Sequence, residues 1–295
     1  MEPVIQVQHL AHRYGRRTIY EDLNFEVPAG KIFGLLGKNG VGKTTLIKIL
    51  MGFLRPGAGR CNVFGEDAFN LSPETRARVG LLFEGHLAYE FMTIAQIEKF
   101  YAPHYPRWNR DRYFDLVNRL GLPHDHKIAN MSRGQRSQVV LGLIMAQQPD
   151  LLLLDDYSMG LDAGYRRLFL DYMVEYLSEG DRTVFLTSHV IQDMHRFVDE
   201  VIFLERGGRL TALSLDDFTE RFRCYRLPRN GYNAEPRAKA VIKNVEIHAD
   251  HLDLFAFATA DQVAEELRKQ GFNPDGLSPV EMNLEDAFIG FTGRY

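Results

Sequence analysis

The sequence has few cysteines and no long apolar run. Its 295 residues include two cysteines, Cys61 and Cys224, which lie far apart and suggest no disulfide framework, as in a reducing cytosol. No stretch approaches the roughly 18 uninterrupted apolar residues of a membrane-spanning helix. The opening residues, Met1 to Val4, lack the basic and apolar regions of a signal peptide. We therefore expect a cytoplasmic chain that reaches a membrane only through a partner.

The sequence also lacks an excess of basic charge. It contains 35 basic and 39 acidic residues, which gives a formal net charge of −4. A DNA-binding domain usually carries a clustered basic face, so we expect no nucleic-acid partner. With 45% hydrophobic and 25% charged residues, the chain has the composition of a globular protein with a core of useful size.

The hydrophobic patterns of the first 213 residues indicate an α/β domain. Short alternating runs between Val4 and Val27 predict an antiparallel β subdomain, and apolar runs at 31–36, 80–83, 151–155, 183–187 and 200–205 predict strands of a parallel core sheet. Residues 44–53 show helical spacing. The stretch at about 86–131 lacks strand patterns, and we interpret it as a helical subdomain.

The remaining residues have a different character. Proline, glycine and asparagine are frequent at 227–240, and we predict a linker over 214–240. Residues 245–258 suggest two short strands, and residues 260–270 suggest a helix. We therefore expect a small α+β C-terminal domain over 241–295.

A glycine-rich loop joins the predicted strand at 31–36 to the predicted helix at 44–53. It matches the phosphate-binding pattern G-x-x-x-x-G-K-[ST] with Gly37, Lys38, Asn39, Gly40, Val41, Gly42, Lys43 and Thr44, and Thr45 follows. Its glycines let backbone N–H groups face a phosphate, and the helix dipole adds to the attraction. We expect Lys43 to reach the β- and γ-phosphates of a nucleotide and Thr44 to bind Mg²⁺. The loop alone leaves kinases, GTPases and many ATPases open.

Further motifs follow the loop in a fixed order. Ser132 and Gln135, with Gly134 between them, have the spacing of a capping box at the start of a helix. Asp155 and Asp156 follow the apolar run at 151–154. Asp162 comes next, and His189 ends a predicted strand after Thr187 and Ser188.

In this order, the motifs resemble those of the ATP-binding cassette (ABC) ATPases over about residues 4–210. The resemblance implies a head-to-tail dimer with a second ABC ATPase chain, identical or different, and ATP sandwiched at the interface. It places Ser132, Gly134 and Gln135 on the γ-phosphate of the other copy's nucleotide and adds Asp162 to the nucleotide-binding residues. It implies that Asp155 binds Mg²⁺ and that Asp156 orients the attacking water. It also implies that His189 contacts the γ-phosphate and that Tyr14 stacks on the adenine ring.

Two positions depart from the family's pattern. The family usually has glutamate where this chain has Asp156, and glutamine where it has Glu84. The resemblance would put Glu84 among the Mg²⁺ ligands and catalytic groups. Aspartate has the shorter arm, and a catalytic group misplaced by about 1 Å can cost on the order of 100-fold in rate. We therefore expect slow or atypical hydrolysis, and a regulatory ABC ATPase or ATP-gated clamp outside transport remains the alternative.

The resemblance also implies a partner. ABC ATPases of this type drive a separate integral membrane subunit, so the chain would lie on the cytoplasmic face of the membrane. The ending at 280–288 is similar to ATPases of drug and antibiotic exporters, which favours export. Aromatic residues at 85–108 would lie near the groove for the membrane subunit.

Two groups of histidines could be considered as metal ligands. They are His124 and His126, with Asp125 between them, and His248 with His251. Each set is small and lacks a completing group at convincing spacing. We interpret all four as surface residues.

Overall fold

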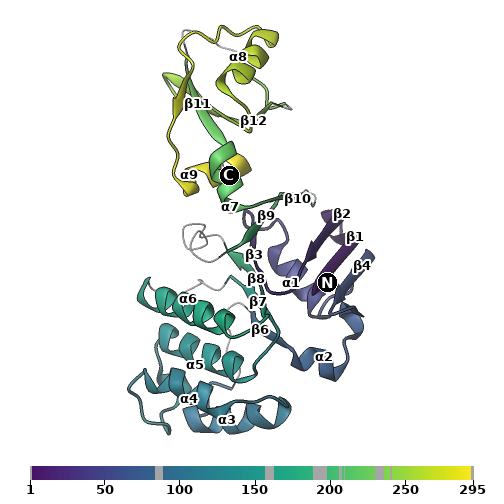
Figure 1. The fold of residues 1–295 in the computed structure, drawn as a ribbon, viewed down its shortest axis with the longest axis vertical. Coiled ribbons are helices and arrows are strands. Elements are labelled where there is room, and N and C mark those ends of the chain that lie inside the picture. The colour runs from purple at the N-terminus through teal and green to yellow at the C-terminus, as the bar shows by residue number, and fades with distance from the viewer. Residues whose placement is uncertain are drawn as a thin grey trace. The chain divides into compact units, whose positions relative to one another are not determined.

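The computed structural model describes residues 2–83, 89–156, 163–188, 198–205, 208, 210–229, 236–239 and 241–293. Two compact units are present: the first ends at Ala212 and the second begins at Leu213. Each unit is described by itself, and both are drawn in Figure 1. No helix within the described ranges combines the length and the apolar character needed to cross a bilayer.

The first unit contains two sheets. The antiparallel sheet has the order β2-β1-β4-β5 and consists of β1 (Ile5–Tyr14), β2 (Arg17–Val27), β4 (Ala58–Val63) and β5 (Glu66–Asp67). The central sheet has the order β10-β9-β3-β8-β7-β6 and consists of β3 (Ile32–Leu36), β6 (Val79–Phe83), β7 (Leu151–Asp155), β8 (Thr183–Ser188), β9 (Glu200–Leu204) and β10 (Leu210–Leu213). Strands β9, β3, β8, β7 and β6 run parallel. This confirms the predicted α/β class with its parallel core sheet.

Helices complete the described part of the first unit. They are α1 (Lys43–Leu50), η1 (Ala68–Asn70), α2 (Pro73–Ala77), α3 (Ile94–Tyr101), η2 (Ala102–His104), α4 (Arg110–Asn118), η3 (Ile128–Asn130), α5 (Arg133–Ala146) and α6 (Ala163–Ser178). Figure 1 shows α3, α4 and α5 together beyond β6, whereas α1 packs against β4 and β7. Helices α3 and α5 begin with complete capping boxes, which satisfy N–H groups that a helix start leaves open.

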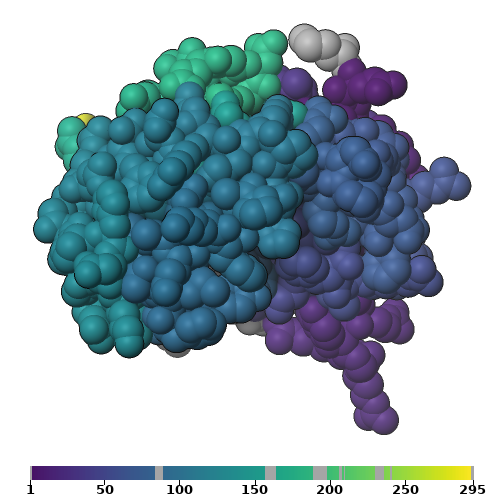
Figure 2. All heavy atoms as spheres, turned by 90° about the horizontal axis from the view of Figure 1, so that it is seen from below, coloured from purple at the N-terminus to yellow at the C-terminus, as the bar shows by residue number. Residues whose placement is uncertain are grey.

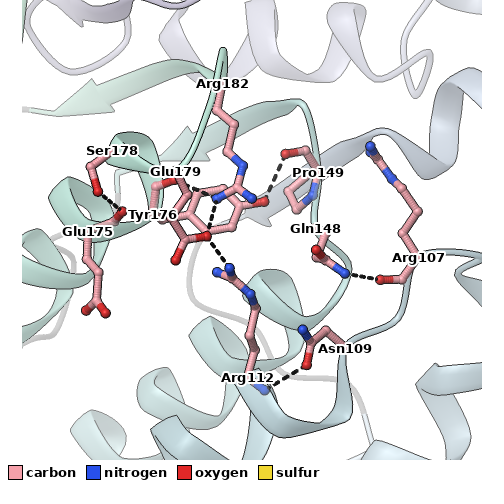
Figure 3. A network of polar contacts seen from close by, with 10 residues as sticks. All are labelled: Arg107, Asn109, Arg112, Gln148, Pro149, Glu175, Tyr176, Ser178, Glu179 and Arg182. Carbon is pink, nitrogen blue, oxygen red and sulfur yellow. Dashed lines mark hydrogen bonds and ion pairs between the residues drawn. The ribbon is translucent and has the colours of Figure 1, made fainter.

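A polar network fixes these helices to the sheet (Figure 3). Glu179, just after α6, accepts hydrogen bonds from Arg112 of α4 and from Arg182, the latter at 3.3 Å. The guanidinium of Arg182 lies 3.6 Å from the ring centroid of Tyr176, whose hydroxyl donates to the carbonyl oxygen of Pro149 at 2.9 Å. Burial raises the pKa of Tyr176 to about 12, so this hydroxyl stays a donor. The network therefore ties α4 and α6 to the entrance of β7.

The second unit is a small α+β fold. It consists of α7 (Leu215–Arg221), β11 (Arg223–Pro228), β12 (Ile242–Ile247), β13 (His251–Ala256), α8 (Ala260–Lys269), β14 (Ser278–Val280) and α9 (Leu284–Thr292). Its antiparallel sheet has the order β12-β13-β11-β14. Val263 and Leu267 of α8 join Leu227, Leu252 and Leu254 in a buried core on one face of this sheet.

Part of the segment predicted as a linker over 214–240 differs from that expectation. Ser214 caps α7 by accepting from the N–H of Asp217, and β11 lies between β13 and β14. Tyr225 and Leu227 of β11 are buried in the core. Proline and glycine are frequent later in the segment and favour a loop there, whereas the residues of β11 alternate between the two faces of a strand. The C-terminal sheet therefore starts before residue 241.

Candidate functional site

The candidate site lies at the carboxyl ends of the parallel strands, where ligands bind in open α/β sheets. Strand β3 leads into the glycine-rich loop, β7 ends at Asp155, and β8 carries Thr187 next to its end. The pairing of Leu36 with Ser188 brings two of these ends together. One pocket here is lined by Tyr14, Arg17, Ile19, Asn39, Gly40, Gly42, Lys43, Thr44, Thr45, Asp155, Asp156 and Thr187.

The loop wraps around the ammonium group of Lys43. Its Nζ donates to the carbonyl oxygens of Gly37 at 2.5 Å and Lys38 at 3.1 Å. Burial lowers the pKa of Lys43, while the carboxylates of Asp156 and Asp155 act in the opposite direction. The ammonium group of Lys43 is therefore held near the N-terminus of α1 and interacts with the carboxylates of Asp155 and Asp156.

Gly42 permits the close approach between the loop and β2. Its φ of 120° is a conformation that side chains rarely adopt, and a Cβ there would lie 2.6 Å from Tyr20 Oη. The Tyr20 hydroxyl donates to the Gly42 carbonyl oxygen. Gly42 also precedes α1 as an N-cap without a side-chain hydrogen bond. The first N–H groups of α1 therefore face the pocket without a capping side chain, which suits an anion.

The acid pair is organised by Thr187. The Thr187 hydroxyl donates to Asp155 Oδ1 at 2.8 Å and accepts from the backbone N–H of Asp156 at 2.9 Å. Asp155 and Thr187 are fully buried, whereas Asp156 is partly exposed and has a φ of 46°. One acid is therefore fixed in the sheet, and the next turns into the pocket mouth.

Several predicted site residues meet in this pocket. They are Tyr14, Asn39, Gly40, Gly42, Lys43, Thr44, Thr45, Asp155 and Asp156. Gly37 and Lys38 contact Lys43 through their carbonyl oxygens, while the side chain of Val41 packs in the hydrophobic core. Glu84, Asp162 and His189 lie outside the described residues.

The predicted signature residues do not line this pocket. Ser132 caps α5, accepting from the N–H of Gln135 at 3.3 Å, while Gln135 Oε1 accepts from the N–H of Ser132 at 2.9 Å. Ser132 is exposed and Gly134 is buried under the Tyr165 ring, where a Cβ would lie 2.4 Å from Tyr165 Cδ2. Ser132 is therefore exposed at the N-terminus of α5, outside the pocket that contains Lys43.

Two polar residues of the pocket, Arg17 and Thr187, are not among the residues that the sequence predicts for the site. Arg17 begins β2 opposite Tyr14 and donates to the Gly40 carbonyl oxygen at 2.5 Å. Thr187 was noted only as the neighbour of His189. The hairpin register and the strand order bring both to the site, and neither has a local motif of its own.

An apolar groove lies on another face of the first unit. It is lined by Met51, Phe53, Pro73, Arg76, Ala77, Val79, Leu81, Tyr101, His104, Tyr105, Val140, Leu143, Ile144 and Gln147. Figure 2 shows the face on which the blue helical segments meet the indigo segments around α1 and α2. The side chain of Phe53 is 59% exposed beside it. Of the aromatic residues expected near a groove, Tyr101 and Tyr105 line it.

The chain is similar to known proteins. Residues 20–158 match the model of the family described as ABC transporter. The chain is 27% identical to the uncharacterized ABC transporter ATP-binding protein YdbJ of Bacillus subtilis, over 99% of this chain and 96% of the relative. It is 26% identical to the bacitracin transport ATP-binding protein BcrA of Bacillus licheniformis, over 99% of this chain and 98% of the relative.

A third relative and a solved structure extend the comparison. The Nod factor export ATP-binding protein I of Rhizobium meliloti is 27% identical, over 98% of this chain and 88% of the relative. The solved structure of an ATP-binding subunit of an ABC transporter superposes with a TM-score of 0.65 at 24% identity. The superposition covers 74% of this chain and 92% of the solved chain. That likeness is one of fold.

Proposed function

Because this chain belongs to the ABC transporter family of ATP-binding proteins, we propose that it hydrolyses ATP as the motor of an exporter whose membrane-spanning part is a separate chain. The observation that carries the proposal is the pocket that joins Lys43, Thr44, Asp155 and Asp156. The motor would dock on the cytoplasmic face of the membrane through that partner.

Each pocket residue has a role in this proposal. Lys43 and the N–H groups at the start of α1 bind the β- and γ-phosphates, and the exposed ring of Tyr14 stacks on adenine. The Thr44 hydroxyl and the Asp155 carboxylate are the hard oxygen ligands that Mg²⁺ prefers. Mg²⁺ held there would neutralise charge on the phosphates. Asp156 orients the attacking water and accepts its proton.

Three further roles rest on the motif order alone. Glu84 follows Phe83, which pairs with Asp155, and is proposed for the Mg²⁺ and water shell. His189 follows Ser188 and is proposed to contact the γ-phosphate. Asp162 is proposed to join the nucleotide site.

We further propose that the complete site forms between two chains. Ser132, Gly134 and Gln135 lie outside the pocket of Lys43, and Ser132 is exposed at the start of α5. A head-to-tail second copy would place its α5 N-terminus, with the Ser132 hydroxyl, against the γ-phosphate. Hydrolysis would then require a dimer.

Mixing two inactive variants tests this arrangement. Lys43→Ala removes the phosphate-binding cation, and Ser132→Arg blocks the signature, so each homodimer should release phosphate at least about 100-fold more slowly than wild type. In a mixed dimer, one site carries both defects and the other carries neither. Equal mixing should therefore restore roughly a quarter of wild-type phosphate release, since half the dimers are mixed and each has one intact site.

The control mixes Lys43→Ala with Lys43→Ala Ser132→Arg, and this pair should stay inactive. If the first mixture also stays inactive while analytical ultracentrifugation shows mixed dimers, a site shared between two identical chains is wrong.

The relatives support the proposal of export with a membrane partner. Both BcrA and the Nod factor protein are named for transport or export, and each aligns with at least 98% of this chain. The groove that Phe53 lines is proposed to receive the membrane subunit, because a largely apolar hollow on a surface marks an interaction site. A regulatory ATPase or clamp remains the second candidate, favoured by aspartate at position 156.

A charge in the groove should uncouple the partner. We expect Phe53→Glu to reduce co-purification of the membrane subunit by at least about tenfold, because desolvating a carboxylate in a largely apolar contact is costly. ATP binding should not change, since Phe53 does not line the nucleotide pocket. Val174→Glu is the matched control, because Val174 is also exposed, at 52%, and lies on α6 outside the groove. Equal co-purification of the two variants would argue against this docking surface.

A further inference from the structure

Four ionisable side chains gather at one end of the C-terminal sheet. Glu246 of β12 pairs with Asp253 of β13, and the hairpin between them closes with His248 N–H donating to the His251 carbonyl oxygen at 2.9 Å. Side chains two residues apart on a strand share a face. Glu246 and His248 therefore lie on the same face as His251 and Asp253, opposite the face where Leu252 and Leu254 enter the core.

These histidines are not the surface residues that the sequence suggested. Their side chains are 28% and 18% exposed, and the rings of His248 and His251 stack with centroids 4.3 Å apart and planes 14° apart. The Nε2 atom of each ring is buried and has no hydrogen-bond partner. By contrast, His124 is exposed, and its Nε2 lies 2.8 Å from Asn118 Oδ1.

The buried nitrogens converge on one carboxylate oxygen. Asp253 Oδ2 lies 3.4 Å from His248 Nε2 and 3.6 Å from His251 Nε2, and the three ligand atoms all lie within 4.8 Å of one another. Ligands about 2.0–2.1 Å from a tetrahedral Zn²⁺ are about 3.3 Å apart. The distances from Asp253 Oδ2 to the two Nε2 atoms are too long for good hydrogen bonds. They are close to the distance between two ligand atoms of such a tetrahedral site.

Neighbouring groups orient these ligands. Asp250 Oδ1 lies 2.7 Å from His251 Nδ1, and a proton held there makes Nε2 the nitrogen of neutral His251 that carries the lone pair. Arg226 donates to both oxygens of Asp253 at 2.9 Å, which fixes the carboxylate while each oxygen keeps a second lone pair. Hydrogen-bonded supporting groups of this kind are typical around metal-binding histidines and carboxylates.

We propose that His248, His251 and Asp253 bind a divalent transition-metal ion of the Zn²⁺ type. Two imidazoles and a carboxylate suit this ion, and water or Glu246, whose Oε2 lies 4.0 Å from His248 Nε2, completes four ligands. The ion links His248, which follows β12, to the start of β13 and so fixes the hairpin. This site belongs to the C-terminal unit and is independent of ATP.

Metal titration of the full chain tests the proposal. The protein, without a histidine tag and with excess Mg²⁺ present, is titrated with Co²⁺ by visible absorption and with Zn²⁺ by calorimetry. One equivalent should bind, and the Co²⁺ complex should show the intense visible bands of a four-coordinate site. His248→Gln and His251→Gln should each weaken Zn²⁺ binding by at least about 100-fold, and Asp250→Asn by about tenfold.

His124→Gln is the matched control and should bind Zn²⁺ like wild type. Thermal unfolding gives a second readout, because an ion that binds only the folded state raises Tm. Zn²⁺ should raise the Tm of wild type and of His124→Gln, and leave the Tm of His248→Gln His251→Gln unchanged. If wild type binds no ion, or if the double variant binds as tightly as wild type, the site does not exist.

Discussion

Replacing Asp156 by asparagine should slow phosphate release by at least about 100-fold and leave ATP affinity within a few-fold of wild type. The change exchanges a carboxylate for an amide of the same shape, so the water loses its proton acceptor, and general-base catalysis contributes about 10²–10⁴ in rate. The fold should survive, because Asp156 has a φ of 46° and asparagine tolerates this region well. The hydrogen bond from its backbone N–H to Thr187 Oγ1 does not depend on the side chain.

Asp156→Glu is the informative companion, since it keeps the charge and lengthens the arm. If the shorter reach of aspartate limits turnover, this variant should release phosphate faster than wild type. Phosphate release from Asp156→Asn equal to wild type would remove Asp156 from catalysis and favour the regulatory ATPase. If Glu84 compensates for the short arm, the effects of Glu84→Gln and Asp156→Glu on the rate should be non-additive.

The parts of the fold that the sequence predicted are those with strong local patterns. The helix predicted from Thr44 begins at Lys43, and the strand predicted at 151–155 is β7 with the same bounds. Each pattern is set by neighbours in sequence, because a buried parallel strand must be apolar on both faces and a phosphate loop needs glycine at fixed positions.

The residues that the sequence missed depend on contacts between distant segments. Thr187 reaches the acid pair because β8 lies next to β7, and Arg17 reaches the loop through its pairing with Tyr14. By contrast, Asp253 is close to His248 and His251 in sequence, but the tight turn and the alternation of β13 decide that the three side chains lie together. Strand order and register are set by the whole sheet, and a single segment does not display them.

The separation of the signature from the pocket also has a spatial origin. Ser132 and Lys43 both precede Asp155 in the sequence. This order does not say how far apart Ser132 and Lys43 lie in space. In the structure, α5 packs against α4 and α6, while α1 packs near β4 and β7. The motif order predicted both halves of an ATP site, and the fold places them in different parts of the first unit.

Replacing Thr187 by valine should have effects on both stability and catalysis. Valine matches threonine in shape but cannot hydrogen-bond, so the Asp155 carboxylate loses a donor and the Asp156 N–H loses an acceptor. Each of the two lost hydrogen bonds costs about 1–3 kcal/mol, so the free energy of unfolding should fall by about 2–6 kcal/mol. Phosphate release should fall by about 100-fold, because a catalytic group that shifts by 1 Å can lose that much.

Thr187→Ser separates the hydroxyl from the packing. Serine keeps both hydrogen bonds and loses only a methyl group, so its free energy of unfolding should fall by only about 1 kcal/mol and its phosphate release should stay within a few-fold of wild type. Urea unfolding and phosphate release are measured on all three proteins under the same conditions. A valine variant that is as active as the serine variant would show that Thr187 does not position the acids. A serine variant as slow as the valine variant would show that the methyl group, and therefore packing between β7 and β8, holds the acids in place.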